Sequence, residues 1–226
     1  MAHEATESKR TQRFPCQGGS LSGIVYLVDD DASFRIAIQR ALKNIGYRVV
    51  AYASAEELLE ERPDENEPGC IVLDVRMPGL SGPALQSRLL ELGSTLPILF
   101  ITGYADVSEI VKALKAGAVD LLTKPVQSNE LQRAIERALA RHQTALEVKR
   151  EFDVLYSRLA TLTRRERQVF VLIVRGKINK QAAHELGVAE RTIKAYRQKV
   201  MQKMKAQSLA DLVLIGQRLG VTTRDD

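Results

Sequence analysis

Long apolar runs are missing from this 226-residue chain, and cysteine is scarce. No apolar stretch approaches the roughly 18 residues that a membrane-spanning helix needs. The first residues are polar and charged, whereas a secretory signal has an apolar segment there. These absences predict a cytoplasmic protein without a membrane partner. The two cysteines, Cys16 and Cys70, lie far apart in the chain, which excludes a disulfide framework.

What the chain does contain is enough for two compact domains, with 45% hydrophobic and 27% charged residues. Its charge is uneven. Residues 24–126 carry 10 Lys and Arg against 15 Asp and Glu, whereas residues 127–226 carry 20 against 11. This asymmetry favours one domain that meets cations or regulators and another that meets a polyanion. An uneven spread of solvated charge is the alternative.

Periodicity is absent from residues 1–23, which predicts a flexible leader. From residue 24, short apolar runs alternate with amphipathic segments. The expected strands are 24–28, 47–52, 70–74, 97–102 and 119–123, and the expected helices are 33–45, 54–62, 83–92 and 106–117. Most of the strand runs are almost continuously apolar, as in strands covered on both faces. Residues 24–127 are therefore expected to form an α/β doubly wound domain around a five-stranded parallel sheet.

Proline and glycine are also absent from residues 128–159, where apolar residues recur at alternating spacings of four and three. This pattern predicts one long linker helix, which includes the last helix of the first domain. A weak coiled coil has the same spacing, but His142 and Lys149 lie on the stripe, so a solvent-bridging linker helix fits at least as well. Residues 160–226 are wholly helical in pattern, which predicts an all-α domain.

Polar side chains stand where the expected strands end. They are Asp29 and Asp30 after the first strand, Asp74 after the third, Thr102 after the fourth and Lys124 after the fifth. Ligands of an open parallel sheet bind outside these carboxyl ends, so the groups should converge. Neighbouring carboxylates repel one another, and Mg²⁺ is the hard cation that suits them best. Beside a metal, an ammonium and a hydroxyl, Asp74 is equipped to accept a phosphoryl group. Taken alone, "DDDAS" is more typical of a helix N-cap, where carboxylates interact favourably with the N-terminal helix dipole.

Several segments resemble the receiver domain of bacterial two-component response regulators. They are "YLVDDD", "VLDVRMPGLSG", "FITGYAD", "KAGAVD" and "TKP", and they cover about residues 24–140. The resemblance implies a CheY/flavodoxin-like fold and a sensor histidine kinase as partner. It implies that Asp74 is the phospho-acceptor, Thr102 the switch hydroxyl and Lys124 the group that senses the phosphoryl oxygens. The implied Mg²⁺ ligands are Asp30, Asp74 and the backbone carbonyl of Arg76, with Asp29 acting mainly through water.

Two positions depart from the receiver pattern. Leu121 stands where an aromatic residue commonly swings inward on activation, and Val126 stands where Phe commonly follows Lys-Pro. Movement of the fourth helix and of the surface of the fifth strand is therefore expected to carry more of the signal. Tyr104 is a candidate substitute for the missing aromatic residue.

The basic half opens with Thr163 and Glu166 at capping-box spacing, which predicts a helix start. Its expected buried face is Val169, Leu172 and Ile173. A second helix is expected at 179–186, and a third, rich in Lys and Arg, is expected to start near Ala189 after the turn at Gly187. Two short helices about a glycine turn predict a helix-turn-helix that enters a groove of duplex DNA. The alternative is a three-helix bundle with a basic, solvated face.

This half resembles the LuxR-type helix-turn-helix of the FixJ/NarL class of response regulators. The matching segments are "LTRRERQV", "GKINKQAA" and "ERTIKAYRQKVMQKM". The resemblance implies promoter DNA, RNA polymerase and a second copy of the chain as partners. It places three residues at the bases, namely Lys194, Ala195 and Gln198. It places five at phosphates, namely Asn179, Lys180, Thr192, Arg197 and Lys199. Val200, Met204 and Leu212 are expected in the core and the dimer surface.

These patterns predict a phosphorylation-controlled transcriptional regulator, an activator by family resemblance, and not an enzyme. A haloacid dehalogenase-type hydrolase is one rival, but it needs a second Asp two residues after the nucleophile, and Arg76 stands there. The other rival is an interaction module that only dimerises through its receiver and binds a protein or RNA with its helical part.

Overall fold

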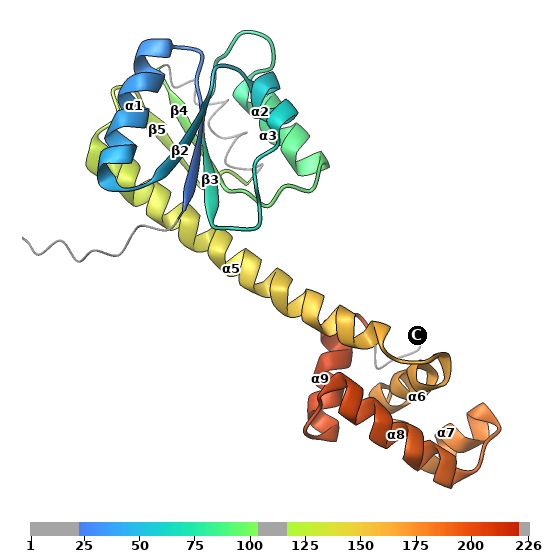
Figure 1. The fold of residues 1–226 in the computed structure, drawn as a ribbon. Helices are drawn as coiled ribbons and strands as arrows, with labels where there is room; N and C mark the ends of the chain where they lie inside the picture. Colours follow the sequence, from blue (N-terminus) through green and yellow to red (C-terminus); the bar gives the residue numbers. More distant parts are fainter. Residues whose placement is uncertain (1–22, 104–116, 222–226) are drawn as a thin grey trace, which may run out of the picture. The chain divides into compact units, whose positions relative to one another are not determined.

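The computed structural model describes residues 23–103 and 117–221. Residue contacts divide the chain into two compact units, Met1–His142 and Gln143–Asp226 (Figure 1). The helix expected at 106–117 and Tyr104 lie outside the described residues, as does nearly all of the expected leader.

The first unit is built on a five-stranded sheet in which every pairing is parallel, in the order β2-β1-β3-β4-β5. The strands are β1 (Ile24–Val28), β2 (Arg48–Tyr52), β3 (Gly69–Asp74), β4 (Ile98–Thr102) and β5 (Asp120–Thr123). The register pairs Val28 with Leu73, Asp74 with Ile101 and Thr102 with Thr123. The carboxyl ends of the central strands therefore lie next to one another, as the sequence predicts.

Burial separates the central strands from the edge strands. Every residue of β1, β3 and β4 is buried, whereas β2 and β5 are partly exposed. The expectation that most strands are covered on both faces holds for β1, β3 and β4. It does not hold for β5, whose Leu121 and Leu122 are half-buried, because among the described strands β5 pairs only with β4 and lies at an edge of the sheet.

Helices cover both faces of the sheet. They are α1 (Ala32–Ile45), α2 (Ala55–Glu61), α3 (Gly82–Glu91) and the first part of α5 (Ser128–Ala160). Alternate residues of β3 enter different cores, because side chains of a strand alternate between faces. Ile71 packs with residues of α2 and α3, and Val72 packs with residues of α1 and α5. The predicted α/β doubly wound fold around a five-stranded parallel sheet is confirmed.

Helix α5 is the long helix expected at 128–159, and the division into units falls within it. Leu131 and Ile135 are buried in the first unit, whereas Leu159 is buried in the core of the second. His142 is fully buried. Its Nδ1 accepts a hydrogen bond from the backbone N–H of Gly69 at 2.9 Å, and its Nε2 lies 3.2 Å from Thr95 Oγ1. The polar side chain of His142 on the apolar stripe of α5 therefore has its hydrogen-bond partners within the first unit.

The second unit contains α6 (Arg164–Val174), α7 (Asn179–Leu186), α8 (Glu190–Met204) and α9 (Leu209–Arg218). The predicted capping box is present: Thr163 Oγ1 accepts from the Glu166 N–H, and Glu166 Oε2 accepts from the Thr163 N–H. Gly187, in the left-handed region at φ 64°, ends α7 and allows the turn into α8. Val200, Met204 and Leu212 are fully buried in this unit's own core.

Among the helices of residues 23–103 and 117–221, none combines the length and apolar character that a membrane span requires.

Candidate functional site

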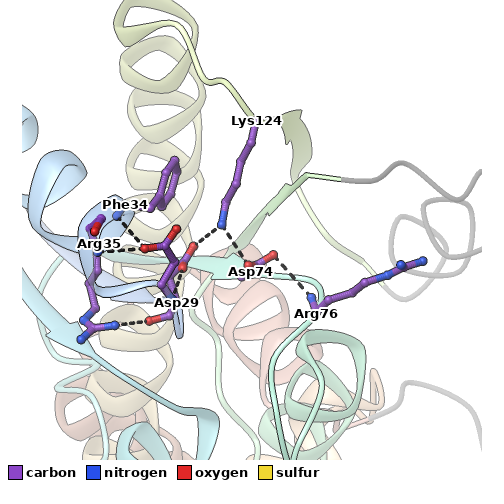
Figure 2. Close-up of polar contacts among 8 residues, drawn as sticks. Asp29, Phe34, Arg35, Asp74, Arg76 and Lys124 are labelled. Atoms are coloured by element: carbon purple, nitrogen blue, oxygen red, sulfur yellow. Dashed lines mark hydrogen bonds and ion pairs between the residues drawn. The ribbon is translucent and has the colours of Figure 1, made fainter.

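The polar residues at the strand ends converge in the structure (Figure 2). One carboxylate oxygen from each of Asp29, Asp30 and Asp74 lies within 4.8 Å of the others. Asp29 and Asp74 are buried at the ends of β1 and β3, whereas Asp30 is exposed. Thr102, buried to 2% exposure, ends the neighbouring strand β4. The topology thus assembles the acidic pocket that the sequence predicts.

Lys124 neutralises part of this charge. Its Nζ donates to Asp29 Oδ2 at 2.6 Å and to Asp74 Oδ2 at 2.9 Å. Burial alone lowers the pKa of Lys124, but its hydrogen bonds to the two carboxylates outweigh burial and raise it above the ordinary value. Burial raises the pKa of Asp29 despite the nearby ammonium. The lysine is therefore held as a cation directly against the predicted acceptor.

Backbone contacts fix the carboxylates around this ammonium. The Asp31 N–H donates to Asp29 Oδ1 at 2.9 Å, and the Arg76 N–H donates to Asp74 Oδ1 at 3.4 Å. Asp31 itself caps α1, accepting from the N–H groups of Ser33 and Phe34. The "DDDAS" segment therefore serves as a helix cap at Asp31 and supplies pocket carboxylates at the two preceding positions.

Gly82 lets the chain pass close to Asp74. Its N–H donates to the carbonyl of Val75 at 3.1 Å, and a Cβ at this position would lie 2.4 Å from the Asp74 carbonyl oxygen. No larger residue fits without displacing the end of β3, so glycine is required by the close approach.

Sequence reasoning missed two residues of α1 that contact the site. Arg35 Nη1 donates to the backbone carbonyl of Asp29 at 2.6 Å. The ring of Phe34 faces Lys124, with 4.1 Å between the ring centroid and Nζ. The pattern of α1 predicts a helix, but it carries no signal that these side chains reach the strand ends.

The donor set fits Mg²⁺. Three convergent carboxylates and one ammonium leave an excess of negative charge, and carboxylate oxygens are the ligands that this hard cation prefers. Receiver domains generally bind Mg²⁺ at such an acidic pocket.

The predicted DNA-contacting residues lie on α7 and α8. Lys194, Ala195, Gln198 and Lys199 are exposed along α8, and Lys180 is exposed on α7; Asn179, Thr192 and Arg197 are half-buried. The guanidinium of Arg197 donates to Asn179 Oδ1 at 3.0 Å, so these two residues also tie α7 to α8. Lys194 Nζ lies 3.8 Å from Glu190 on the same exposed helix.

Comparisons with known families match both halves of the chain. Residues 25–136 match the response regulator receiver domain, and residues 160–215 match the luxR family of bacterial regulatory proteins. Nodulation protein W of Bradyrhizobium diazoefficiens is 44% identical over 211 residues, which cover 91% of this chain and 92% of that protein. The transcriptional regulatory protein FixJ of the same species is 39% identical, with coverage of 88% and 97%.

A solved structure resembles both halves together. The response regulator StyR has a TM-score of 0.77 at 40% identity, and the match covers 87% of this chain and 99% of that one. The chain therefore belongs to the two-component response regulators that join a receiver to a LuxR-type domain. It is a phosphorylation-controlled transcriptional regulator whose partners are a histidine kinase and DNA.

Proposed function

We propose that Asp74 is the phospho-acceptor and that phosphorylation controls binding of the second unit to promoter DNA. The observation that carries this assignment is the ammonium of Lys124, which bridges Asp29 and Asp74 within the carboxylate cluster. Asp74 is buried to 8% exposure at the end of a fully buried strand, so its carboxylate is held in a fixed position at the pocket.

In the proposed transfer, a carboxylate oxygen of Asp74 attacks the phosphorus of the kinase phosphohistidine. An O–P bond forms while the N–P bond breaks, and its electron pair returns to the imidazole nitrogen. Asp30, Asp74 and the Arg76 carbonyl would hold Mg²⁺, with Asp29 acting through water, and the bound metal would supply positive charge to the transferring oxygens. Lys124 pairs with the phosphoryl oxygens, and the Thr102 hydroxyl donates a hydrogen bond to them.

The pocket supports a signalling acceptor and not a hydrolase. A haloacid dehalogenase-type enzyme needs a carboxylic acid two residues after its nucleophile, and Arg76 occupies that position with its backbone N–H directed at Asp74. Without an acid there, phosphorylated Asp74 is proposed to persist as a signal.

The signal is proposed to leave through the surface of β5. Leu121, at the usual place of the switch aromatic, is half-buried beside Phe100 and packs against the core, so it offers no ring to turn inward. Rearrangement of β5 and of the segment expected to be helical at 106–117 would favour a homodimer that binds paired half-sites and recruits RNA polymerase as an activator. Because promoter DNA lies in the bacterial cytoplasm, the protein acts there.

On the DNA side, Lys194, Ala195 and Gln198 are proposed to read bases, because they are exposed along α8. The proposed phosphate contacts are Asn179, Lys180, Thr192, Arg197 and Lys199.

Sedimentation and duplex-DNA binding test the phosphorylation switch. Both are measured in Mg²⁺, with and without fluoroberyllate as the phosphoryl mimic, for wild type and Asp74→Asn. The mimic is expected to drive dimerisation and tighter DNA binding in wild type only. Asp31→Asn is the matched control, because the side chain of Asp31 caps α1 and an Asn side chain can form the same cap. Identical responses of wild type and Asp74→Asn would contradict the assignment.

A further inference from the structure

The ammonium of Lys124 has an aromatic contact in addition to its two carboxylates. The Phe34 ring lies with its centroid 4.1 Å from Nζ, well within the distance at which a cation is attracted to a ring face (Figure 2). The lysine side chain is only 20% exposed, so this attraction is weakly screened by water. Phe34 also packs against the core shared by α1 and α5, which holds its ring in place.

The two carboxylates that hold Lys124 are themselves predicted to bind other groups. Asp29 Oδ2 and Asp74 Oδ2 are the acceptors of the ammonium, and both residues belong to the cluster that fits Mg²⁺. Phosphorylation of Asp74 converts its carboxylate into an acyl phosphate, so the carboxylate charge that holds Lys124 is lost. Both events weaken the hold of the carboxylates on Lys124, whereas the ring of Phe34 takes part in neither.

We infer that Phe34 is a positioning residue, which keeps the Lys124 ammonium at the pocket when Mg²⁺ and a phosphoryl group engage Asp29 and Asp74. This inference rests on the proposed function. The ring favours a cation against its face, and it closes the α1 side of the ammonium, so Nζ stays within reach of the phosphoryl oxygens. The contribution of Phe34 is therefore larger in the phosphorylated state than in the free state.

The test compares full-length wild type with two variants. Phe34→Leu keeps an apolar side chain and removes the ring, whereas Phe34→Trp keeps the aromatic face. The sequence contains no tryptophan, so Phe34→Trp also places a single tryptophan beside the pocket, whose fluorescence can be excited selectively. Titration calorimetry measures the affinity for Mg²⁺ alone and then the affinity for fluoroberyllate in saturating Mg²⁺.

Phe34→Leu is expected to bind fluoroberyllate about five-fold more weakly, the equivalent of about 1 kcal/mol for a partly desolvated cation–π contact. Its affinity for Mg²⁺ alone should fall less than its affinity for fluoroberyllate, because Phe34 supplies none of the proposed metal ligands. Phe34→Trp should restore fluoroberyllate binding and show a fluorescence change when it is added.

Two results overturn the role of Phe34. Unchanged fluoroberyllate affinity in Phe34→Leu would show that Phe34 has no positioning role. An equal loss of affinity for Mg²⁺ and for fluoroberyllate would show that Phe34 only packs α1 against the sheet. If wild type shows no fluoroberyllate binding that depends on Asp74, the proposed function falls and takes this inference with it. That failure is visible in wild type, so it is distinct from a failure confined to the Phe34 variants.

Discussion

Ile178 occupies the N-cap of α7, a position that favours Ser, Thr, Asn or Asp because their side chains accept a hydrogen bond from the first helical turn. No side chain caps α7 from this position, although Gln181 Oε1 accepts from the Ile178 N–H. Half of a capping box is thus present, and the other half is missing. Ile178 is 61% exposed, so its side chain contributes little burial.

Ile178→Ser is therefore expected to stabilise the protein by about 1 kcal/mol, because the hydroxyl can accept from the Gln181 N–H. Urea unfolding followed by far-ultraviolet circular dichroism measures the change. Ile178→Ala is the control, since it shortens the side chain without adding an acceptor. Equal unfolding free energies for the Ser and Ala variants would show that the cap does not form.

Single residues also mark the limit of prediction from sequence. Asp29, Asp74 and Lys124 could be placed together because each follows a strand, and parallel strands end at one edge of a sheet. Phe34 could not, since its contact with Lys124 depends on how α1 is rotated on the sheet. Hydrophobic patterning indicates that Phe34 packs inward, but not that a cation lies against its ring.

At the scale of elements, α6 is joined to α8 by one buried carboxylate. Glu166 is 3% exposed, and its Oε2 accepts from the Thr163 N–H and from Lys203 Nζ at 2.6 Å. The hydrogen bond with Lys203 is the main cause that lowers the pKa of Glu166 below its ordinary value of 4.5. A carboxyl whose folded pKa is lowered stabilises the protein above its unfolded pKa, and the effect is lost as pH falls through the folded pKa.

Glu166→Gln is expected to lower the unfolding free energy at pH 7 by about 1–2 kcal/mol, because the amide keeps the cap but loses the charged hydrogen bond. The difference from wild type should be constant above pH 4.5 and shrink as pH falls below it. Urea titrations between pH 7 and pH 3 measure this. Glu185→Gln is the control, since its pair with Lys177 is 40% exposed at both side chains and should matter far less. If the difference in unfolding free energy did not depend on pH, Glu166 would stabilise the protein through packing and not through its charge.

The strands and helices in the described residues largely follow the apolar pattern, because that pattern records which faces are buried. Edge positions do not follow from it: Leu121 and Leu122 of β5 are apolar yet only half-buried, because pairing order decides which strands lie at the edge. His142 shows the same limit on α5. Its polarity argues against a coiled coil, but only the fold reveals its hydrogen bond with Gly69.

At the scale of the whole chain, the sign of the net charge differs between the two parts that serve different functions. Residues 24–126, with an excess of acidic groups, include the pocket that fits Mg²⁺, and residues 127–226, with an excess of basic groups, include the helix-turn-helix. Composition could predict this assignment but not the division between the units. That division falls inside α5, where no change in the helical pattern marks it.

The excess of basic residues makes DNA binding dependent on salt, and two lysines of α8 should show different parts of it. Lys199→Ala, if Lys199 contacts a phosphate, is expected to weaken binding equally on all duplexes and to reduce the slope of log affinity against log salt by about one. Lys194→Ala, if Lys194 reads a base as proposed, should cost about 1–3 kcal/mol on the preferred operator and relax the preference at one base pair. Both side chains are exposed, and Lys194 lies 3.8 Å from Glu190, an exposed pair that is readily exchanged for a base contact.

Fluorescence anisotropy on an operator selected from random duplexes, and on its single-base variants, measures both effects across a salt series. Equal losses for Lys194→Ala on every duplex would move this residue from the bases to the phosphates.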